Sequence, residues 1–546
     1  MKREKGITLV ALVVTIVVLL ILAGVSINLV LGENGLIIQA QESKRKTKES
    51  TANELADLDR INTELAKYGN IQNVFEGGNW NETLGLCTPK LGTNMVGVYW
   101  SDGTKNEMGL YVASATSTNV EVTSEQPEFS WSEWYNYRAE SEEKLDSKKS
   151  RWANAKSIID GSYFVWIPRY EYKILSGEHT STAGKIDVEF INLNTTTANK
   201  DGYKIHPAFT TNLQLGGWDK NISGVWIAKY EMSMEEKSNT EETWINRFPK
   251  LTLNITNISE NVRMVSKPNR YPWTYINISN SFSNSKKYSE LQKTGANSHL
   301  IKNSEWGAVV YLAHSKYGRN GNEVALNNYN DEENNTKLTG FSIGVTNSRK
   351  TNENKPENQY NGINGMKAST TGNLYGIYDF NGGDYEQIAM IYSNTGNNNQ
   401  ESLYNEIGYS FEKDNRLNKT PDSKDSTKYV TIYPINTETA EEDASIHVQY
   451  NEWSSMYGDA MYETSNNVPS SDGSWFLDHA DHDGDTATNE PVIIRGGYSD
   501  WSGNAGIFAF ADYIGVGSAD CRLSYNINLW IKDIVEKSHT IIKWIN

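Results

Sequence analysis

A short acidic stretch near the C-terminal end, DHADHDGDTATNE at residues 478–490, carries residue types that bind metal ions. Asp481, Asp483 and Asp485 would bring carboxylate oxygens together around a glycine, and Ca²⁺ prefers such oxygen ligands. The order D-x-D-G-D differs from the D-x-[DN]-x-[DN]-G order of the EF-hand loop. Two interpretations stay open: a solvated acidic loop, which we favour, and a Ca²⁺ site. We predict no other cofactor.

Other chemistry is poorly supported by the sequence. There is no Ser/His/Asp pattern, no Walker loop and no HExxH motif, so hydrolase and NTPase activities lack their usual residues. The two cysteines, Cys87 and Cys521, are far apart and make no disulfide framework; whether they pair or stay free is open. A net charge of -17 argues against a nucleic-acid partner. Recognition of a ligand is the remaining class.

The segment YSDWSGNAGIFAFADYIGVGSADCRLS, residues 498–524, has the composition of a binding surface. It lacks Lys, Glu, Gln and Met, and its aromatic residues alternate with Ser, Asp, Asn and Gly. Tyr and Trp offer rigid contact area, while small polar residues adapt their hydrogen bonds. Alternation predicts that Phe508 and Phe510 share an inward face. The candidate ligand contacts are Tyr498, Ser499, Asp500, Ser502, Asn504, Asp512, Tyr513 and Asp520.

The body that must position this segment is expected to be rich in strands after residue 70. Short apolar or alternating runs are separated by turns rich in Asn, Gly, Ser and Thr. A helix is expected within residues 299–318, with a capping sequence that begins at Asn303. The side chains of Trp273 and Trp306 are expected to pack in the core or in turns. The charged segment 141–157 predicts a linker before a larger domain at about residue 158. The runs expected to form strands are 95–100, 109–115, 163–174 and 224–233.

The N-terminal region predicts a membrane anchor. Residues 7–31 contain no charged residue, and as a helix they would span roughly 37 Å, enough to cross a bilayer. Leu55, Leu58, Ile61 and Leu65 recur at helical spacing before Gly69, which predicts a helical stem over residues 32–69. Positive charges flank the apolar run on both sides, so charge alone does not give its orientation.

The stretch KGITLVAL, residues 5–12, resembles the cleavage and methylation segment of type IV pilins and pseudopilins. The resemblance implies a leader of residues 1–6, cleavage after Gly6 by a prepilin peptidase, and N-methylation of Ile7. It also implies a cytoplasmic N-terminus with the bulk of the chain outside the cell. Ala11 stands where such pilins usually have Glu, a residue that helps subunits to register inside a filament, so polymerisation is not implied.

Several later segments, in order, resemble the formylglycine-generating-enzyme/sulfatase-modifying branch of the C-type lectin fold. They are YFVWIPRYEYKI, VWIAKYEMS, HLIKNSEWGAVVYLAHSKYG, GNLYGIYDFNGGDYEQ, IIRGGYSDWSGNAGIFAF and CRLS, between residues 158 and 526. Enzymes of this family bind copper through two nearby cysteines. Here the matching region holds only Cys521, so an oxidase of this type is an alternative that we do not favour.

The C-terminal part of this region also resembles the variable tail of proteins diversified by retroelements, which use the same fold branch. The resemblance implies that framing residues enclose positions changed by adenine-directed mutation. Mutation of Asn codons that end in a pyrimidine cannot yield Lys, Glu, Gln, Met or Trp, which fits the composition if Trp501 is fixed. The framing residues would be Arg495, Gly496, Gly497, Ala505, Gly506, Phe508 and Arg522.

The sequence therefore predicts an α+β fold: a pilin-like membrane-spanning helix followed by a loop-rich, β-rich ectodomain of C-type-lectin/sulfatase-modifying type. The expected parts are a region over residues 70–157, the main domain over 158–530 and a tail over 531–546. The expected protein lies in the cell membrane and binds an extracellular protein or glycan, with pilus or secretion assembly proteins as further expected partners. The alternatives are a sulfatase-modifying-type enzyme and a structural pseudopilin.

Overall fold

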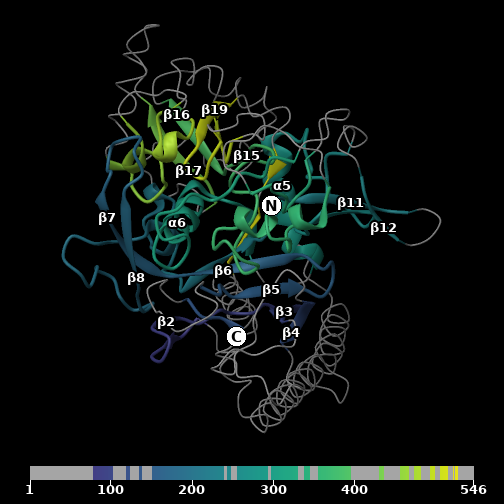
Figure 1. Ribbon diagram of the computed structural model, residues 1–546, viewed down its shortest axis with the longest axis horizontal. Helices are drawn as coiled ribbons and strands as arrows, with labels where there is room; N and C mark the ends of the chain where they lie inside the picture. The colour runs from purple at the N-terminus through teal and green to yellow at the C-terminus, as the bar shows by residue number, and fades with distance from the viewer. Residues whose placement is uncertain are drawn as a thin grey trace, which may run out of the picture. The chain divides into compact units, whose positions relative to one another are not determined.

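The computed structural model describes a series of segments, all of them within residues Asn73–Asn546 (Figure 1). The description covers residues 78–101, 118–122, 134–137, 150–238, 243–247, 255–292, 297–329, 337–344, 354–394, 429–435, 455–466, 472–480, 492–497, 505–513, 520–521 and 523–526.

The largest sheet has seven strands in the order β14-β21-β10-β6-β5-β3-β4, and every neighbouring pair is antiparallel. At its centre Trp166 of β6 lies opposite Trp226 of β10, with ring centroids 5.3 Å apart. Strands from both sides of residue 158 join this one sheet. The bounds are β3 Met95–Ser101, β4 Thr118–Val122, β5 Asn154–Ser157, β6 Tyr163–Pro168, β10 Gly224–Ala228, β14 Asn297–Leu300 and β21 Leu523–Asn526.

Smaller sheets surround this one. Two of them have three strands each, in the orders β8-β7-β9 and β12-β11-β13. A third has four strands in the order β19-β18-β15-β20. The last two are strand pairs, β16 with β17 and β1 with β2. Their bounds are β1 Trp80–Asn81, β2 Leu86–Cys87, β7 Tyr170–Ser176, β8 Lys185–Phe190, β9 Lys204–Ile205, β11 Ser233–Lys237, β12 Trp244–Asn246, β13 Val262–Val265, β15 Glu386–Gln387, β16 Met390–Asn394, β17 Thr431–Ile435, β18 Val492–Arg495, β19 Phe510–Tyr513 and β20 Asp520–Cys521.

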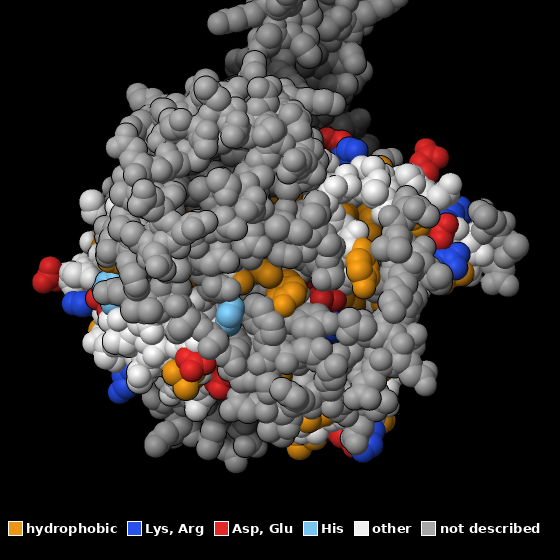
Figure 2. Space-filling model, turned by 90° about the horizontal axis from the view of Figure 1, so that it is seen from above, with side chains coloured by type: hydrophobic (Ala, Val, Ile, Leu, Met, Phe, Trp, Pro, Cys, Tyr) orange, Lys and Arg blue, Asp and Glu red, His pale blue; other side chains and the backbone are white. Residues whose placement is uncertain are grey.

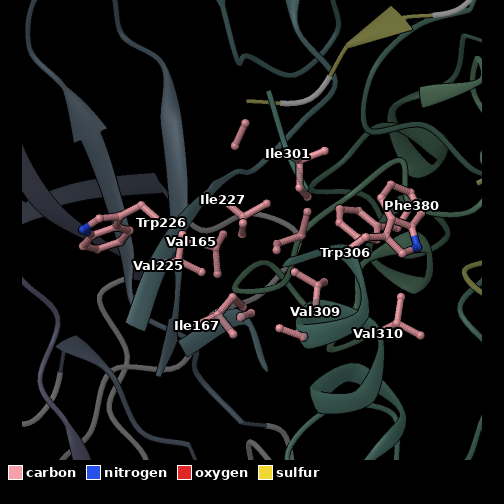
Figure 3. Packing of buried hydrophobic residues seen from close by; sticks show 14 of the residues in the cluster. Val165, Ile167, Val225, Trp226, Ile227, Ile301, Trp306, Val309, Val310 and Phe380 are labelled. Carbon is pink, nitrogen blue, oxygen red and sulfur yellow. The ribbon is translucent and has the colours of Figure 1, made fainter. Parts of the chain in front are cut away.

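The main core lies between the large sheet and helix α6, Asn303–His314. Figure 3 shows Val165 and Ile167 of β6 and Val225 and Ile227 of β10 lying near Val309 of α6. All twelve residues of α6 are buried, so the helix predicted within residues 299–318 is present but is enclosed on every side. Its N-terminus is capped by Glu305, whose carboxylate accepts from the Lys302 backbone N–H at 2.9 Å.

The predicted fold class, an α+β protein headed by a membrane-spanning helix, is wrong. The described residues fold mostly as sheet and loop, with two α-helices, α5 (Ile278–Gln292) and α6. Neither of these helices is long and apolar enough to cross a membrane. The segments from which the anchor, stem and leader were predicted, residues 7–31, 32–69 and 1–6, lie outside the described part of the chain, as do Gly6 and Ile7.

Candidate functional site

The described parts of the predicted ligand-binding segment include two strands, β19 and β20, of the four-stranded sheet β19-β18-β15-β20. Arg495 at the end of β18 pairs with Phe510 of β19 on one side and with Glu386 of β15 on the other. Among the candidate contacts, Asp512 and Tyr513 lie on β19, opposite Ile493 and Val492, and Asp520 lies on β20, opposite Glu386. β19 and β20 are the two edge strands of this sheet. The candidate contacts Asp512 and Tyr513 therefore lie at one edge, and Asp520 lies at the other.

Two glycines turn the chain at the end of β18. Gly496 and Gly497 have φ angles of 82° and 75°, a left-handed conformation that favours glycine because it has no Cβ. The Gly496 carbonyl accepts from Gly382 N at 3.0 Å and from Gly506 N at 3.2 Å. The second bond joins the points where the chain leaves and re-enters the sheet region. The residues between, including Tyr498, Ser499, Asp500, Ser502 and Asn504, lie outside the described part, as does Arg522.

Arg495 is fully buried and holds three acceptors. Its Nη1 donates to Asn303 Oδ1 at 3.0 Å and to the Asp459 carbonyl at 3.1 Å, while Nη2 donates to the Ala460 carbonyl at 3.0 Å. Burial lowers the pKa of Arg495 to about 10, a value at which the guanidinium remains charged at neutral pH. Arg495 therefore acts as a buried structural cation.

A buried polar chain extends from the same arginine. Asn303 donates from Nδ2 to the Tyr433 hydroxyl at 2.8 Å, and that hydroxyl donates to Asp459 Oδ2 at 2.7 Å. Desolvation raises the pKa of the buried Asp459 carboxyl. Sequence reasoning missed Tyr433 and Asp459, because neither belongs to a motif and both meet Arg495 only through the fold.

Asp478 holds the chain that follows segment 498–504. Below, residues 495–497 and 505–510, which flank that segment, are called the frame. Its Oδ2 accepts from Phe508 N at 3.0 Å, and a Cβ on Gly506 would lie 1.8 Å from that oxygen. Only glycine leaves room for the carboxylate here. Asp478 is fully buried, and desolvation, with a smaller contribution from Glu323, raises its pKa well above the ordinary value. Asp478 thus packs against the frame, whereas the acidic stretch was expected to be solvated or to bind metal.

The frame packs against two stacked aromatic rings. Trp306 stacks on Phe380 with ring centroids 4.0 Å apart, and its indole N–H donates to the Ile507 carbonyl at 2.9 Å. Phe508 and Phe510 are buried, as the alternation predicted, but Ile507 and Ala509 are buried too because β19 begins only at Phe510. Ala505 is also buried. Trp273 and Trp306 serve packing as predicted.

Of the two cysteines, the structure describes the side chain of Cys87 only. Cys87 is a buried thiol on β2 that donates to the Ile191 carbonyl, and burial raises its pKa to about 11. It is therefore protonated at neutral pH, which is unsuitable for a nucleophile or a metal thiolate. Cys521 lies on β20 opposite Gln387.

Within the described segments, no three His, Cys, Asp or Glu residues cluster closely enough to hold a metal ion. The predicted calcium ligands Asp481, Asp483 and Asp485 lie outside those segments. The calcium site therefore stays a prediction.

No protein-family model matches the chain, and no curated protein matches it.

Proposed function

We propose that this protein recognises an extracellular protein or glycan through the segment 498–504 and the adjoining strand edges β19 and β20. The observation that carries the proposal is the closure of the segment at its base, where Gly506 N donates to the Gly496 carbonyl at 3.2 Å. Seven residues rich in aromatic and small polar side chains leave and return at one point of a buried scaffold. Binding loops are typically held in this way by a rigid framework.

The buried frame also supports the idea that the segment varies in sequence. Arg495, Gly506 and Phe508 have no freedom to change, since each fills or vacates a specific space in the core. The residues enclosed by these positions include the aromatic and small polar residues of segment 498–504. We therefore propose that this is a diversified tail, as the resemblance implies. The sequenced 3′ ends of this gene across one population should differ mainly at adenine positions between the codons for Arg495 and Arg522. A uniform tail would remove the diversification and leave the binding proposal standing.

The binding role is tested with the full-length protein applied to a printed glycan array and to a panel of cultured cells. The variant Asp500→Ala/Tyr513→Ala/Asp520→Ala removes three candidate contacts while leaving the buried frame intact. A matched control replaces two exposed aspartates and an exposed tyrosine elsewhere: Asp201→Ala/Asp219→Ala/Tyr275→Ala.

We expect wild type and the control to bind the same glycans or cells, and the first variant to lose that binding with an unchanged melting temperature. Equal binding by all three proteins would contradict the proposal and favour a structural role. Copper-dependent oxidation of a cysteine peptide by the wild type, lost in Cys521→Ser, would instead favour the enzyme alternative.

The predicted location at the cell membrane, and the prepilin peptidase and assembly partners, stay predictions, because they rest on residues outside the described part of the chain.

A further inference from the structure

A polar cavity lies beside strand β12 of the sheet β12-β11-β13, which takes no part in the proposed recognition segment. Its volume is about 490 Å³, and the residues that line it include Trp244, Asn246, Asn269, Arg270, Tyr271 and Gln359. Figure 1 shows β11 and β12 at one side of the molecule, away from β19. This volume lies within the usual range of small-molecule sites.

Positive charge collects beside this cavity in a chain that is acidic overall. Glu235 is buried, and its carboxylate is surrounded by three cations: Arg263 Nη2 at 2.6 Å, Lys267 Nζ at 3.0 Å and Arg270 Nε at 3.4 Å. Asp160 also attracts Lys267, so among these described groups two carboxylates face three cations. The nearby Arg247 and Glu236 pair with each other at 2.9 Å. Figure 2 shows side chains of both charges at the end of the molecule where β11 and β12 lie.

Arg270 is the cation that both lines the cavity and is accessible. Its side chain is 39% exposed, compared with 16% for both Arg263 and Lys267. Its Nε makes no hydrogen bond among the described residues, although it lies near Glu235. A guanidinium held by one carboxylate on its inner side can still present its remaining N–H groups to a second carboxylate.

The rest of the lining suits the hydroxyl groups and the apolar face of a sugar. Arg263 lies over the Trp244 ring at 4.1 Å from its centroid, which fixes the plane of the indole at the edge of the cavity. Asn246 is held by the Met234 and Tyr271 carbonyls at 3.0 and 3.2 Å, so the wall is preorganised. Asn269 has φ 56°, and its buried Oδ1 has no hydrogen-bond partner among the described residues. The Asn269 Nδ2 donates to Gln359 Oε1 at 3.4 Å, so these two amides are held together in the wall.

We infer that this cavity binds a sugar that carries a carboxylate, such as a uronic acid or sialic acid residue of a glycan. Arg270 pairs with the carboxylate, the Gln359 side chain bonds a ring hydroxyl, and Trp244 contacts the apolar ring face. This site uses none of the residues assigned to the C-terminal recognition segment. The two proposals therefore succeed or fail independently.

The test measures binding of two probes, methyl β-glucuronide and methyl β-glucoside, to the full-length protein by calorimetry or ligand-observed NMR. A charge-assisted bidentate contact predicts a Kd for the glucuronide at least about tenfold lower than for the glucoside. Arg270→Gln should abolish this difference. Trp244→Ala should weaken both ligands, while the control Arg247→Gln, on the same hairpin but outside the cavity lining, should change neither.

Three results would overturn the inference: no binding of the glucuronide at millimolar concentration, equal affinity for both probes, or an unchanged preference in Arg270→Gln with its fold intact. Acetate competing as strongly as the glucuronide would show a carboxylate subsite without sugar recognition, which also overturns it. The Asp500/Tyr513/Asp520 variant should bind the glucuronide normally, whatever its behaviour on cells or arrays.

Discussion

Arg495 donates from Nη1 to Asn303 Oδ1 at 3.0 Å, and this bond ties the last residue of β18 to the first residue of α6. The two residues are 192 positions apart in the chain. Because α6 is buried on every side, a strand end bonded to its first turn has little freedom to move. The position of the Gly496–Gly497 turn is therefore set by the core.

The first prediction concerns the hydrogen bonds that Arg495 donates. Arg495→Met should lower the free energy of unfolding by about 3 kcal/mol, because it leaves three buried acceptors without their donors. Denaturant unfolding measures the change. Arg247→Met, which breaks the part-exposed pair with Glu236, should cost less than about 1 kcal/mol. Similar losses in the two variants would show that Arg495 does not hold the frame.

The second prediction concerns the contact between Gly506 and Asp478. Gly506→Ala should destabilise the protein by about 3 kcal/mol, because its Cβ would lie 1.8 Å from a buried carboxylate oxygen. Gly85→Ala is the comparison, since nothing lies within 4 Å of its Cβ and only its φ of 62° opposes alanine. It should cost about 1 kcal/mol.

A double-mutant cycle separates this clash from other effects at Gly506. Asp478→Ala removes the oxygen that the new methyl group would strike, so the double variant Gly506→Ala/Asp478→Ala should lose less stability than the sum of the two single variants. Strict additivity would mean that the two residues are not in contact.

Some of this arrangement could be predicted from local sequence. Alternating apolar runs predicted strands that the structure places at β3, β6 and β10, and the two adjacent glycines after Arg495 adopt the left-handed conformation that glycine favours. The run at residues 109–115 lies outside the described part. Such features could be predicted because period-two burial and left-handed glycine depend on a few neighbouring residues.

The partners of the frame could not be predicted in the same way. Asp478 stands at the start of a stretch dense in charge, which favours solvent, yet it is buried because Phe508 and Gly506 leave space and an N–H for it. Lys229 is another case: it is fully buried and its Nζ donates to Asn154 Oδ1 and to the Leu374 and Gly376 carbonyls. These contacts depend on packing between distant segments, for which local sequence gives no signal.

The third prediction is that ionisation of Asp384 lowers the stability of the folded protein as the pH rises. This carboxyl is fully buried, its Oδ1 makes no hydrogen bond among the described residues, and burial raises its pKa from 3.8 to about 6. The folded state thus binds a proton more tightly than the unfolded state. Its contribution to stability is fully present below pH 3.8 and is lost as the pH rises through about 6.

Denaturant unfolding at pH 4 and pH 7 checks this effect. Relative to Asp384→Asn, which cannot titrate, the wild type should lose up to about 3 kcal/mol between the two pH values. If both proteins changed equally with pH, the carboxyl would titrate alike in the folded and unfolded chains.

The fourth prediction has the opposite sign and concerns His206. Its ring is enclosed by Tyr170 and Tyr172, with centroids 5.0 and 5.4 Å away, and burial lowers its pKa from 6.5 to about 3. The folded protein therefore holds the neutral ring, whose Nδ1 accepts from Ala208 N at 3.3 Å. Its contribution to stability is fully present above pH 6.5 and is lost as the pH falls toward 3.

His206→Asn isolates the effect of His206 protonation on stability, because asparagine keeps an acceptor for Ala208 N but does not titrate. The variant has a lower stability at pH 7, since the smaller side chain leaves a cavity among the aromatic rings. Between pH 7 and pH 4.5, however, it should lose about 2 kcal/mol less than the wild type. An acid loss that persists undiminished in His206→Asn would place its origin in another group.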